Sequence, residues 1–189
     1  DNMNSRVQKF NSSGAFITTW GTKGTGNGQF HFPTGIAAPT IAGTTRIYVA
    51  DASGRRVQAF SETGTFALKW GSDTTSNGRF NMLGHLKADS SGNIFAADTL
   101  NCRIQKFSSR GDFRMKFGME GLGDGQYMGP ADMAVDSSGF IYVVDASANL
   151  VQKFDSSGNF VTKWGGMGSG DGELFTPRGI AVGPSGDIY

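Results

Sequence analysis

The chain has 189 residues, a formal net charge of +1 and only 17% charged residues. This near-neutral, mixed charge argues against binding to nucleic-acid phosphates, which requires a strongly basic surface. The single cysteine excludes an intrachain disulfide framework, and no apolar stretch is long enough to cross a membrane.

One sequence pattern with a period of about 47 residues occurs four times and occupies nearly the whole chain. Its clearest line ends in Phe and appears as Arg6–Phe10, Arg56–Phe60, Arg103–Phe107 and Leu150–Phe154. Repetition at this period is typical of units that bury their apolar faces by stacking on their neighbours. The repeats cover about 1–50, 51–97, 98–144 and 145–189, in one region (1–189) that starts and stops within a unit.

Each unit is expected to contain four short strands, as residues 86–117 illustrate. A first strand near Leu86–Ala88 is followed by Ile94–Ala97, Arg103–Phe107 and Phe113–Phe117. These segments are rich in β-branched and aromatic residues, and the turns between them contain Gly, Ser and Asp. No window has sustained helical periodicity. The sequence therefore predicts an all-β chain built as four consecutive blades of a β-propeller.

Each predicted fourth strand ends in an aromatic residue followed by Gly, and a Gly-rich crossing to the next unit comes after it. The aromatic residues are Trp20, Trp70, Phe117 and Trp164. Their fixed register predicts that they are largely buried between blades. The same burial is predicted for the phenylalanines of the third strands, Phe10, Phe60, Phe107 and Phe154.

The line from Asp145 through Trp164-Gly165 to Val182 resembles an NHL repeat, and the resemblance extends over all four units. It implies NHL-type blades, which usually form six-bladed propellers, so that this chain is expected to be part of a six-bladed or polymeric assembly. It also implies a binding platform for proteins, RNA or other ligands. A minority of related propellers are enzymes with a metal in the central channel.

An Asp recurs at the end of each second strand, at Asp1, Asp51, Asp98 and Asp145. A ring of metal ligands is one interpretation. We favour a structural one, in which the carboxylate accepts loop N–H groups and pairs with the Arg five residues later. Asp145 is the exception, because Leu150 stands where the other units have Arg.

No cofactor is expected from the sequence. His31 and His85 occupy different positions in the repeat, and no Cys or His partners are visible for a metal site. The Gly-rich crossings lack the following helix and the Lys-Ser/Thr ending of a phosphate-binding loop. Cys102 occupies a variable loop position and has no base at a recognisable spacing.

The positions at which the units differ are the best candidates for a ligand site. His85, Asp132 and Arg178 form a polar, non-repeated set at the entrance to the first strands, and Lys87 stands where other units have Ala. In a propeller these positions lie at the mouth of the central channel. We therefore predict ligand binding there; ordinary solvated variation at the rim is the alternative.

The favoured functional hypothesis is a non-catalytic binding or structural scaffold for a protein or glycan ligand, extracellular or at a cell surface. The sequon at Asn11 provides a glycosylation site in a secretory setting. The alternatives are a metal-dependent propeller hydrolase or lyase with a channel site and an RNA-binding NHL domain. The mainly apolar first strands argue against the enzyme.

The units at the two ends are expected to contain strands without a pairing partner. An exposed strand edge of this kind tends to pair with a strand of another chain. Residues 1–21 have the strands that a unit ending at Tyr189 lacks. They could complete that unit within one chain or between chains, giving a ring or filament, or the sequence could be an excerpt of a longer array. We expect self-association between chains.

Overall fold

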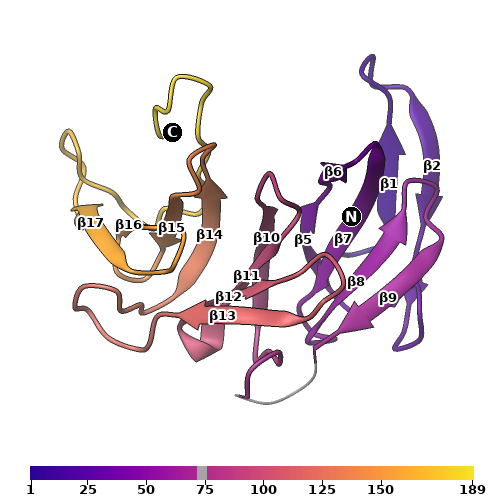
Figure 1. Cartoon of the computed structure of the whole chain (residues 1–189), viewed down its shortest axis with the longest axis horizontal. Coiled ribbons are helices and arrows are strands. Elements are labelled where there is room, and N and C mark those ends of the chain that lie inside the picture. Colours follow the sequence, from indigo (N-terminus) through magenta and orange to yellow (C-terminus); the bar gives the residue numbers. More distant parts are fainter. Residues whose placement is uncertain (72–75) are drawn as a thin grey trace.

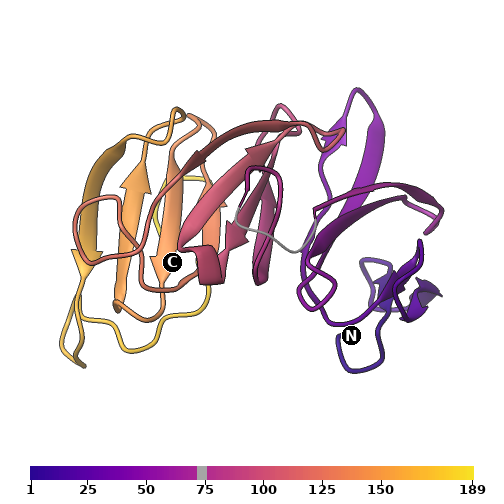
Figure 2. The same ribbon diagram turned by 90° about the horizontal axis from the view of Figure 1, so that it is seen from below.

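The structure is a computed structural model that describes residues 1–71 and 76–189. It is an all-β chain whose sheets follow one another along an open arc (Figure 1). Turned by 90°, the same sheets lie one after another along the long axis (Figure 2). The predicted fold class is therefore confirmed.

Three sheets have the four-stranded antiparallel order predicted for a blade. The first is β5 (Pro33–Ala37), β7 (Thr44–Asp51), β8 (Arg56–Ser61) and β9 (Phe66–Trp70), with β6 (Thr40–Ile41) added to β7. The second is β10 (Leu83–Ala88), β11 (Ile94–Asp98), β12 (Arg103–Phe107) and β13 (Phe113–Phe117). The third is β14 (Pro130–Val135), β15 (Ile141–Asp145), β16 (Leu150–Phe154) and β17 (Phe160–Gly165). The first strands β5, β10 and β14 line the inner side of the arc, and the fourth strands β9, β13 and β17 its outer side (Figure 1).

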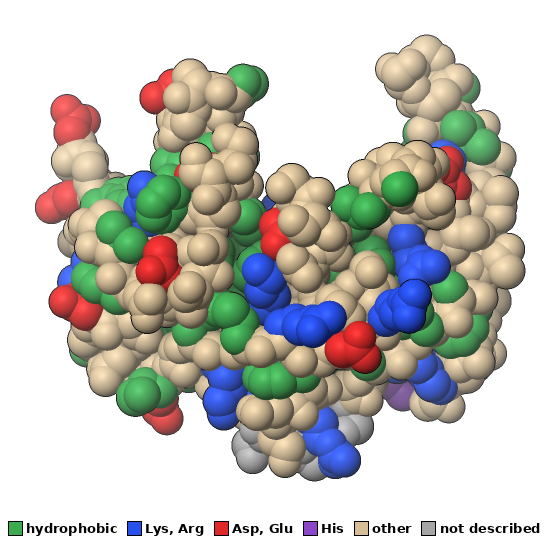
Figure 3. Space-filling model, viewed as in Figure 1, with side chains coloured by type: hydrophobic (Ala, Val, Ile, Leu, Met, Phe, Trp, Pro, Cys, Tyr) green, Lys and Arg blue, Asp and Glu red, His purple; other side chains and the backbone are tan. Residues whose placement is uncertain are grey.

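Smaller elements complete the described chain. They are a two-stranded sheet, β1 (Val7–Phe10) with β2 (Phe16–Trp20), a parallel pair in the first crossing, β3 (Thr22–Lys23) with β4 (Gln29–Phe30), and a 3₁₀ turn, η1 (Thr99–Asn101). At the other end, Ala181 and Tyr189 exchange two backbone hydrogen bonds and form a short antiparallel pair. The β1–β2 sheet and this pair lie at opposite ends of the arc (Figure 1), separated by a wide notch at the top of the space-filling view (Figure 3).

The apolar core lies in the seams, which are the interfaces between neighbouring sheets. In each seam a Phe of one third strand receives an aromatic ring from the preceding fourth strand and another from the crossing. The sets are Trp20 and Phe30 on Phe60, Trp70 and Phe80 on Phe107, and Phe117 and Tyr127 on Phe154, with ring centroids 4.8 to 6.0 Å apart. Phe60, Phe107 and Phe154 are buried, as predicted. Neighbouring blades thus stabilise one another chiefly by removing aromatic surface from water.

The predicted burial of Phe10 and Trp164 is wrong. Phe10 is 52% exposed and Trp164 is 38% exposed. Each of these side chains belongs to an end of the row of sheets, where no neighbouring sheet covers it. Trp20 and Trp70 are only half-buried, although each packs on the next sheet. The register prediction identified the seam positions correctly, but burial at a seam requires a sheet on both sides.

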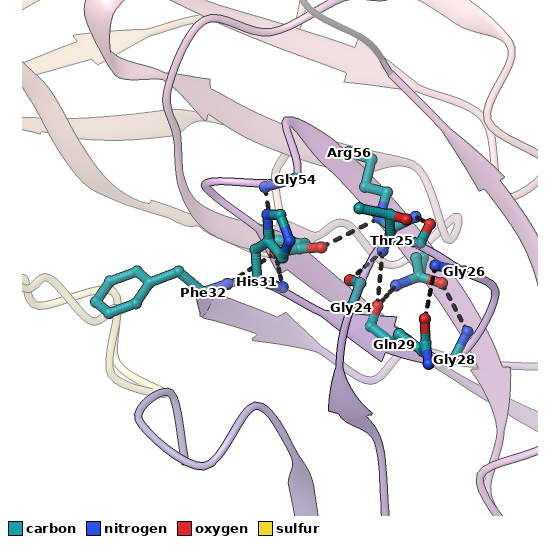
Figure 4. Close-up of polar contacts among 11 residues, drawn as sticks. Gly24, Thr25, Gly26, Gly28, Gln29, His31, Phe32, Gly54 and Arg56 are labelled. Atoms are coloured by element: carbon teal, nitrogen blue, oxygen red, sulfur yellow. Dashed lines mark hydrogen bonds and ion pairs between the residues drawn. The ribbon is translucent and has the colours of Figure 1, made fainter.

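The recurring Asp has the predicted structural role. Asp51 is buried and accepts hydrogen bonds from the backbone N–H groups of His31 and Phe32, both at 2.9 Å. Its other oxygen lies 3.1 Å from Arg56 Nε. Arg56 in turn donates to the carbonyl of Gln29 at 2.7 Å, so that one ion pair holds the crossing against the sheet (Figure 4). Buried charges are tolerated when they are paired in this way.

Asp145 shows what replaces the missing Arg. This fully buried carboxylate accepts four backbone hydrogen bonds, from Met128 (2.7 Å), Gly129 (3.0 Å), Ser147 (3.2 Å) and Ala148 (3.0 Å). Several N–H dipoles directed at one carboxylate stabilise its charge without a cation. The exception in the repeat is therefore a structural variant of the same loop-holding role.

Candidate functional site

The predicted polar residues meet at Asp132, on the inner strand β14. Its side chain is buried, yet the carboxylate contacts the inner strand β10 on one side and the backbone of the following unit on the other. One oxygen lies 3.2 Å from His85 Nδ1 and 3.7 Å from Lys87 Nζ, both on β10. The other oxygen accepts a hydrogen bond from the backbone N–H of Ile180 at 3.3 Å. Asp132 therefore ties three consecutive units together on the inner side of the arc.

The contacts of Asp132 differ in quality. His85 Nδ1 is within ion-pair distance of Oδ1 but is not aligned as a hydrogen bond, so that this buried oxygen accepts no well-formed hydrogen bond among the described residues. Burial alone would raise the pKa of Asp132. The contacts with His85 and the backbone of Met133, and the charge of Lys87, outweigh burial and lower this pKa below its ordinary value. Asp132 is therefore an anion at neutral pH.

Beside this cluster lies a hollow of about 860 Å³. It is enclosed by the loops that follow the second strands and by the entrances to the first strands. Phe32, Met82 and Leu100 form an apolar wall, and His85, Arg55 and Arg178 bring basic groups. Among the described residues that line the hollow, none is acidic. The volume falls within the range of small-molecule and side-chain binding sites, about 300–1,000 Å³.

The four predicted site residues do not all face the same space. His85 and Arg178 line the hollow, Asp132 lies buried beside it, and Lys87 lines a separate, smaller hollow further along β10. The structure thus brings His85, Lys87 and Asp132 into contact, while Arg178 shares only the cavity with His85. Their role in binding stays a prediction.

Sequence reasoning missed Arg55 and the apolar wall of Phe32 and Leu100. Arg55 has a left-handed backbone, with φ of 50°. The corresponding residues of the other units, Ser5, Cys102 and Asn149, have the same left-handed conformation. This position of the repeat has a different side chain in every unit, and that variation could have marked it as a candidate for ligand binding. Only the folded loop shows that Arg55 lines the hollow.

Cys102, which occupies this loop position in the second blade, is not arranged as a nucleophile. Its side chain is buried, and burial, with smaller contributions from the charges of Glu120, Asp145 and Asp98, raises the pKa of its thiol. A thiol with a raised pKa holds little of the reactive thiolate at neutral pH.

Within residues 1–71 and 76–189, no three or more His, Cys, Asp or Glu side chains converge as metal ligands would. The same residues contain no helix with the length and apolar character needed to cross a membrane. Asn11, the predicted glycosylation site, lies in the exposed turn between β1 and β2, where its Oδ1 accepts hydrogen bonds from Ser13 and Ala15.

Comparison with known proteins agrees with the fold. A sequence model described as the NHL repeat matches residues 127–154, which confirms the resemblance in the third blade. A virginiamycin B lyase from Staphylococcus aureus superposes with a TM-score of 0.71 at 14% identity, over 99% of this chain and 56% of its own.

Two further structures have similar scores. A streptogramin B lyase has a TM-score of 0.68 at 14% identity, over 99% of this chain and 69% of its own. A protein of unknown function from Bacteroides caccae has a TM-score of 0.68 at 12% identity, over 99% of this chain and 61% of its own. No match was found among curated proteins.

These identities show the fold alone. Together with the repeated sequence pattern, these structures define the fold of this chain as a β-propeller, with an NHL repeat at residues 127–154. The chain spans little more than half the length of the Staphylococcus aureus lyase.

Proposed function

We propose that this chain is a non-catalytic binding module that takes its ligand in the hollow beside Asp132. The observation that supports the proposal is the lining, which sets an apolar wall against basic side chains and, within residues 1–71 and 76–189, contains no acidic residue. A ligand that carries an anionic group next to an apolar group matches both parts. A protein segment with a carboxylate beside an apolar side chain is the ligand class that we propose.

The basic groups of the hollow differ in their availability. His85 is engaged by Asp132, and Arg178 is exposed, with no hydrogen bond or ion pair among the described residues. A guanidinium binds a carboxylate through two parallel hydrogen bonds, which gives orientation as well as affinity. Arg178 is therefore the group that we expect to hold the anionic end of the ligand, while Leu100, which is 60% exposed, contacts the apolar end.

The proposal is tested with two probes that share an aromatic body. 8-Anilinonaphthalene-1-sulfonate carries an anionic group, and N-phenyl-1-naphthylamine does not. We expect Arg178→Gln to weaken binding of the sulfonate about 3- to 10-fold, as the loss of one exposed charge-assisted contact of about 1 kcal/mol predicts. Binding of the neutral probe should not change. Leu100→Ala should weaken both probes.

Arg114→Gln is the matched control, because Arg114 is an exposed arginine on the outer strand β13, away from the hollow. Fluorescence titration gives both dissociation constants. Equal sulfonate affinities for wild type, Arg178→Gln and Arg114→Gln would contradict the proposal.

A second candidate, acid–base catalysis, rests on one observation. The imidazole of His85 lies at the wall of the hollow with Nδ1 3.2 Å from a carboxylate oxygen of Asp132. An imidazole beside a carboxylate is a frequent general acid or base in enzymes. The His85 side chain is 45% exposed, so that solvent and ligand can reach it.

The two candidates give different results with p-nitrophenyl esters of apolar carboxylic acids. A binding module releases nitrophenol at the same rate in wild type and in His85→Gln. Turnover that disappears in His85→Gln, while binding of the sulfonate probe is retained, would favour the catalytic candidate over the binding module.

A further inference from the structure

A second hollow lies in the seam between the first and second blades, and we call it the seam hollow. It has a volume of about 240 Å³ and lies where the beginning of β7 in one sheet approaches the turn between β12 and β13 in the next. None of the described residues that line it also lines the larger hollow beside Asp132, so that it is a separate site. The described lining consists of Pro39, Ile41, Thr44, Arg46, Tyr48, Gly92, Ser109 and Arg110.

One wall of the seam hollow comes from an insertion in the first blade, between its first and second strands. In the second blade this connection is the tight turn 89–93, whose last residue donates its backbone N–H to the carboxylate of its first residue at 2.9 Å, and the third blade has the same turn. In the first blade the N–H of Arg46 donates instead to the carbonyl of Pro39 at 3.2 Å, and the residues between them contain β6. Ile41 of this insertion reaches the second blade, because a Cβ added to Gly92 would lie 2.7 Å from its side chain.

Two arginines at non-repeated positions line the seam hollow. Arg46 comes directly before the core of the second strand, where the next blades have Asn93 and Phe140. Arg110 belongs to the turn between β12 and β13, where the turns of the other units have Ser or Thr. In the next seam the corresponding residues are Asn93 and Ser157, which carry no charge. The first seam therefore differs from the second by two positive charges, one from each blade.

Both guanidinium groups have hydrogen-bond donors available for a ligand. Arg46 Nη1 donates to the carbonyl of Ser109 over a long 3.5 Å, and the phenol of Tyr48 donates to the same carbonyl at 2.9 Å. Burial raises the pKa of the Tyr48 phenol, and the neighbouring charge of Arg46 opposes this rise. Arg110 is exposed, and its side chain has no hydrogen bond or ion pair among the described residues. Since a guanidinium carries five N–H donors, most of those of both arginines are free.

The charges of the seam hollow favour an anion with several oxygens. The described residues that line it include no acidic side chain, and two like charges that share a small hollow repel each other. A carboxylate has two oxygens, which a single guanidinium can bind. A phosphate monoester has three terminal oxygens and a charge of about −1.5 to −2 at neutral pH, so that it can bind two guanidinium groups at once.

We propose that the seam hollow binds a phosphate monoester, whose terminal oxygens are held by Arg46 and Arg110. The hollow is smaller than the lower limit of about 300 Å³ that is usual for sites that enclose a whole small molecule, so it holds the phosphate and the first atoms of the group that carries it. Pro39 and Ile41 contact that group, and the hydroxyl of Thr44 is a further donor. Because the two arginines belong to different blades, the bound phosphate also joins the first blade to the second.

The proposal is tested with three anions that share a phenyl ring, namely phenyl phosphate, phenyl sulfate and benzoate. Isothermal titration calorimetry at low salt and about pH 8, above the second phosphate pKa of about 6, should give the tightest binding for phenyl phosphate, which alone is a dianion there. Its binding should weaken below that pKa, where it loses one charge. Arg110→Gln and Arg46→Gln should each weaken the binding of phenyl phosphate about 10-fold, as the loss of one charge-assisted contact predicts.

Arg114→Gln is the matched control, because Arg114 is an exposed arginine of β13 that does not line the seam hollow. It should bind phenyl phosphate as wild type does. Arg110 is exposed, so Arg110→Gln keeps the test decisive if Arg46→Gln does not fold. Absence of phenyl phosphate binding by wild type at millimolar concentrations, benzoate that binds as tightly as phenyl phosphate, or equal affinities for wild type and Arg110→Gln would overturn the proposal. Binding that is lost in Arg178→Gln instead would place the phosphate in the larger hollow and overturn it as well.

Discussion

Truncation of Trp70 measures how much a seam contributes to stability. The ring of Trp70 lies 5.6 Å from that of Phe107 in the next sheet and 5.9 Å from that of Tyr48 in its own, and it covers Gly111. Replacing a buried large aromatic residue by Ala costs about 3–5 kcal/mol. Since Trp70 is half-buried, we expect Trp70→Ala to lower the free energy of unfolding by about 3 kcal/mol, the lower end of that range.

Trp164→Ala is the matched control, because Trp164 has the same position in the repeat but is 38% exposed, and among the described residues its one aromatic ring partner is Tyr142 of its own sheet, at 6.2 Å. We expect this change to cost about 1 kcal/mol, the centre of the distribution for single substitutions, because Trp164 is partly covered but lies in no interior seam. With a urea dependence of about 2 kcal/mol per molar, these losses lower the unfolding midpoint by about 1.5 M for Trp70→Ala and about 0.5 M for Trp164→Ala.

The assay is urea unfolding followed by far-ultraviolet circular dichroism, at protein concentrations low enough for a single copy. A loss below about 1 kcal/mol for Trp70→Ala, under the range for a buried aromatic residue, would refute the seam as the source of stability. Equal losses for the two variants would do the same.

Two further predictions concern charge and backbone. Because the pKa of Asp132 is lowered, its carboxylate stabilises the fold at pH values above the ordinary pKa, and this stabilisation is lost as the pH falls through the lowered pKa. Asp132→Asn should therefore destabilise the chain at pH 7 and make its stability depend less on pH in the acid range. A dependence equal to that of wild type in acid titrations would contradict this. Gly64→Ala and Gly14→Ala impose similar backbone strain, because the φ values are 85° and 82°. Only the Cβ at Gly64 would meet the ring of Trp20, so Gly64→Ala should lower the midpoint of thermal unfolding more than Gly14→Ala. Equal midpoints for the two variants would contradict the packing argument.

The candidate site was predictable only in part. His85, Asp132, Lys87 and Arg178 stood out because they interrupt a repeat, and three of them are in contact in the fold. The sequence could not show that Lys87 and Arg178 face different hollows. That depends on how neighbouring first strands lie beside one another, which is set by packing between sheets rather than by any one strand.

By itself, the sequence determined the strands and their order. Strand alternation, turn glycines and a fixed period are local properties, and they act in the same way in each unit. The loop-holding role of Asp51 followed as well, because its Arg partner is only five residues away.

Only the tertiary structure decided which repeated residues are buried. Phe60 and Phe10 have the same place in the repeat, yet Phe60 is enclosed and Phe10 is exposed. The surface that removes such a ring from water comes from the neighbouring unit, about 40 residues away in the sequence, so burial depends on whether a neighbouring sheet is in place.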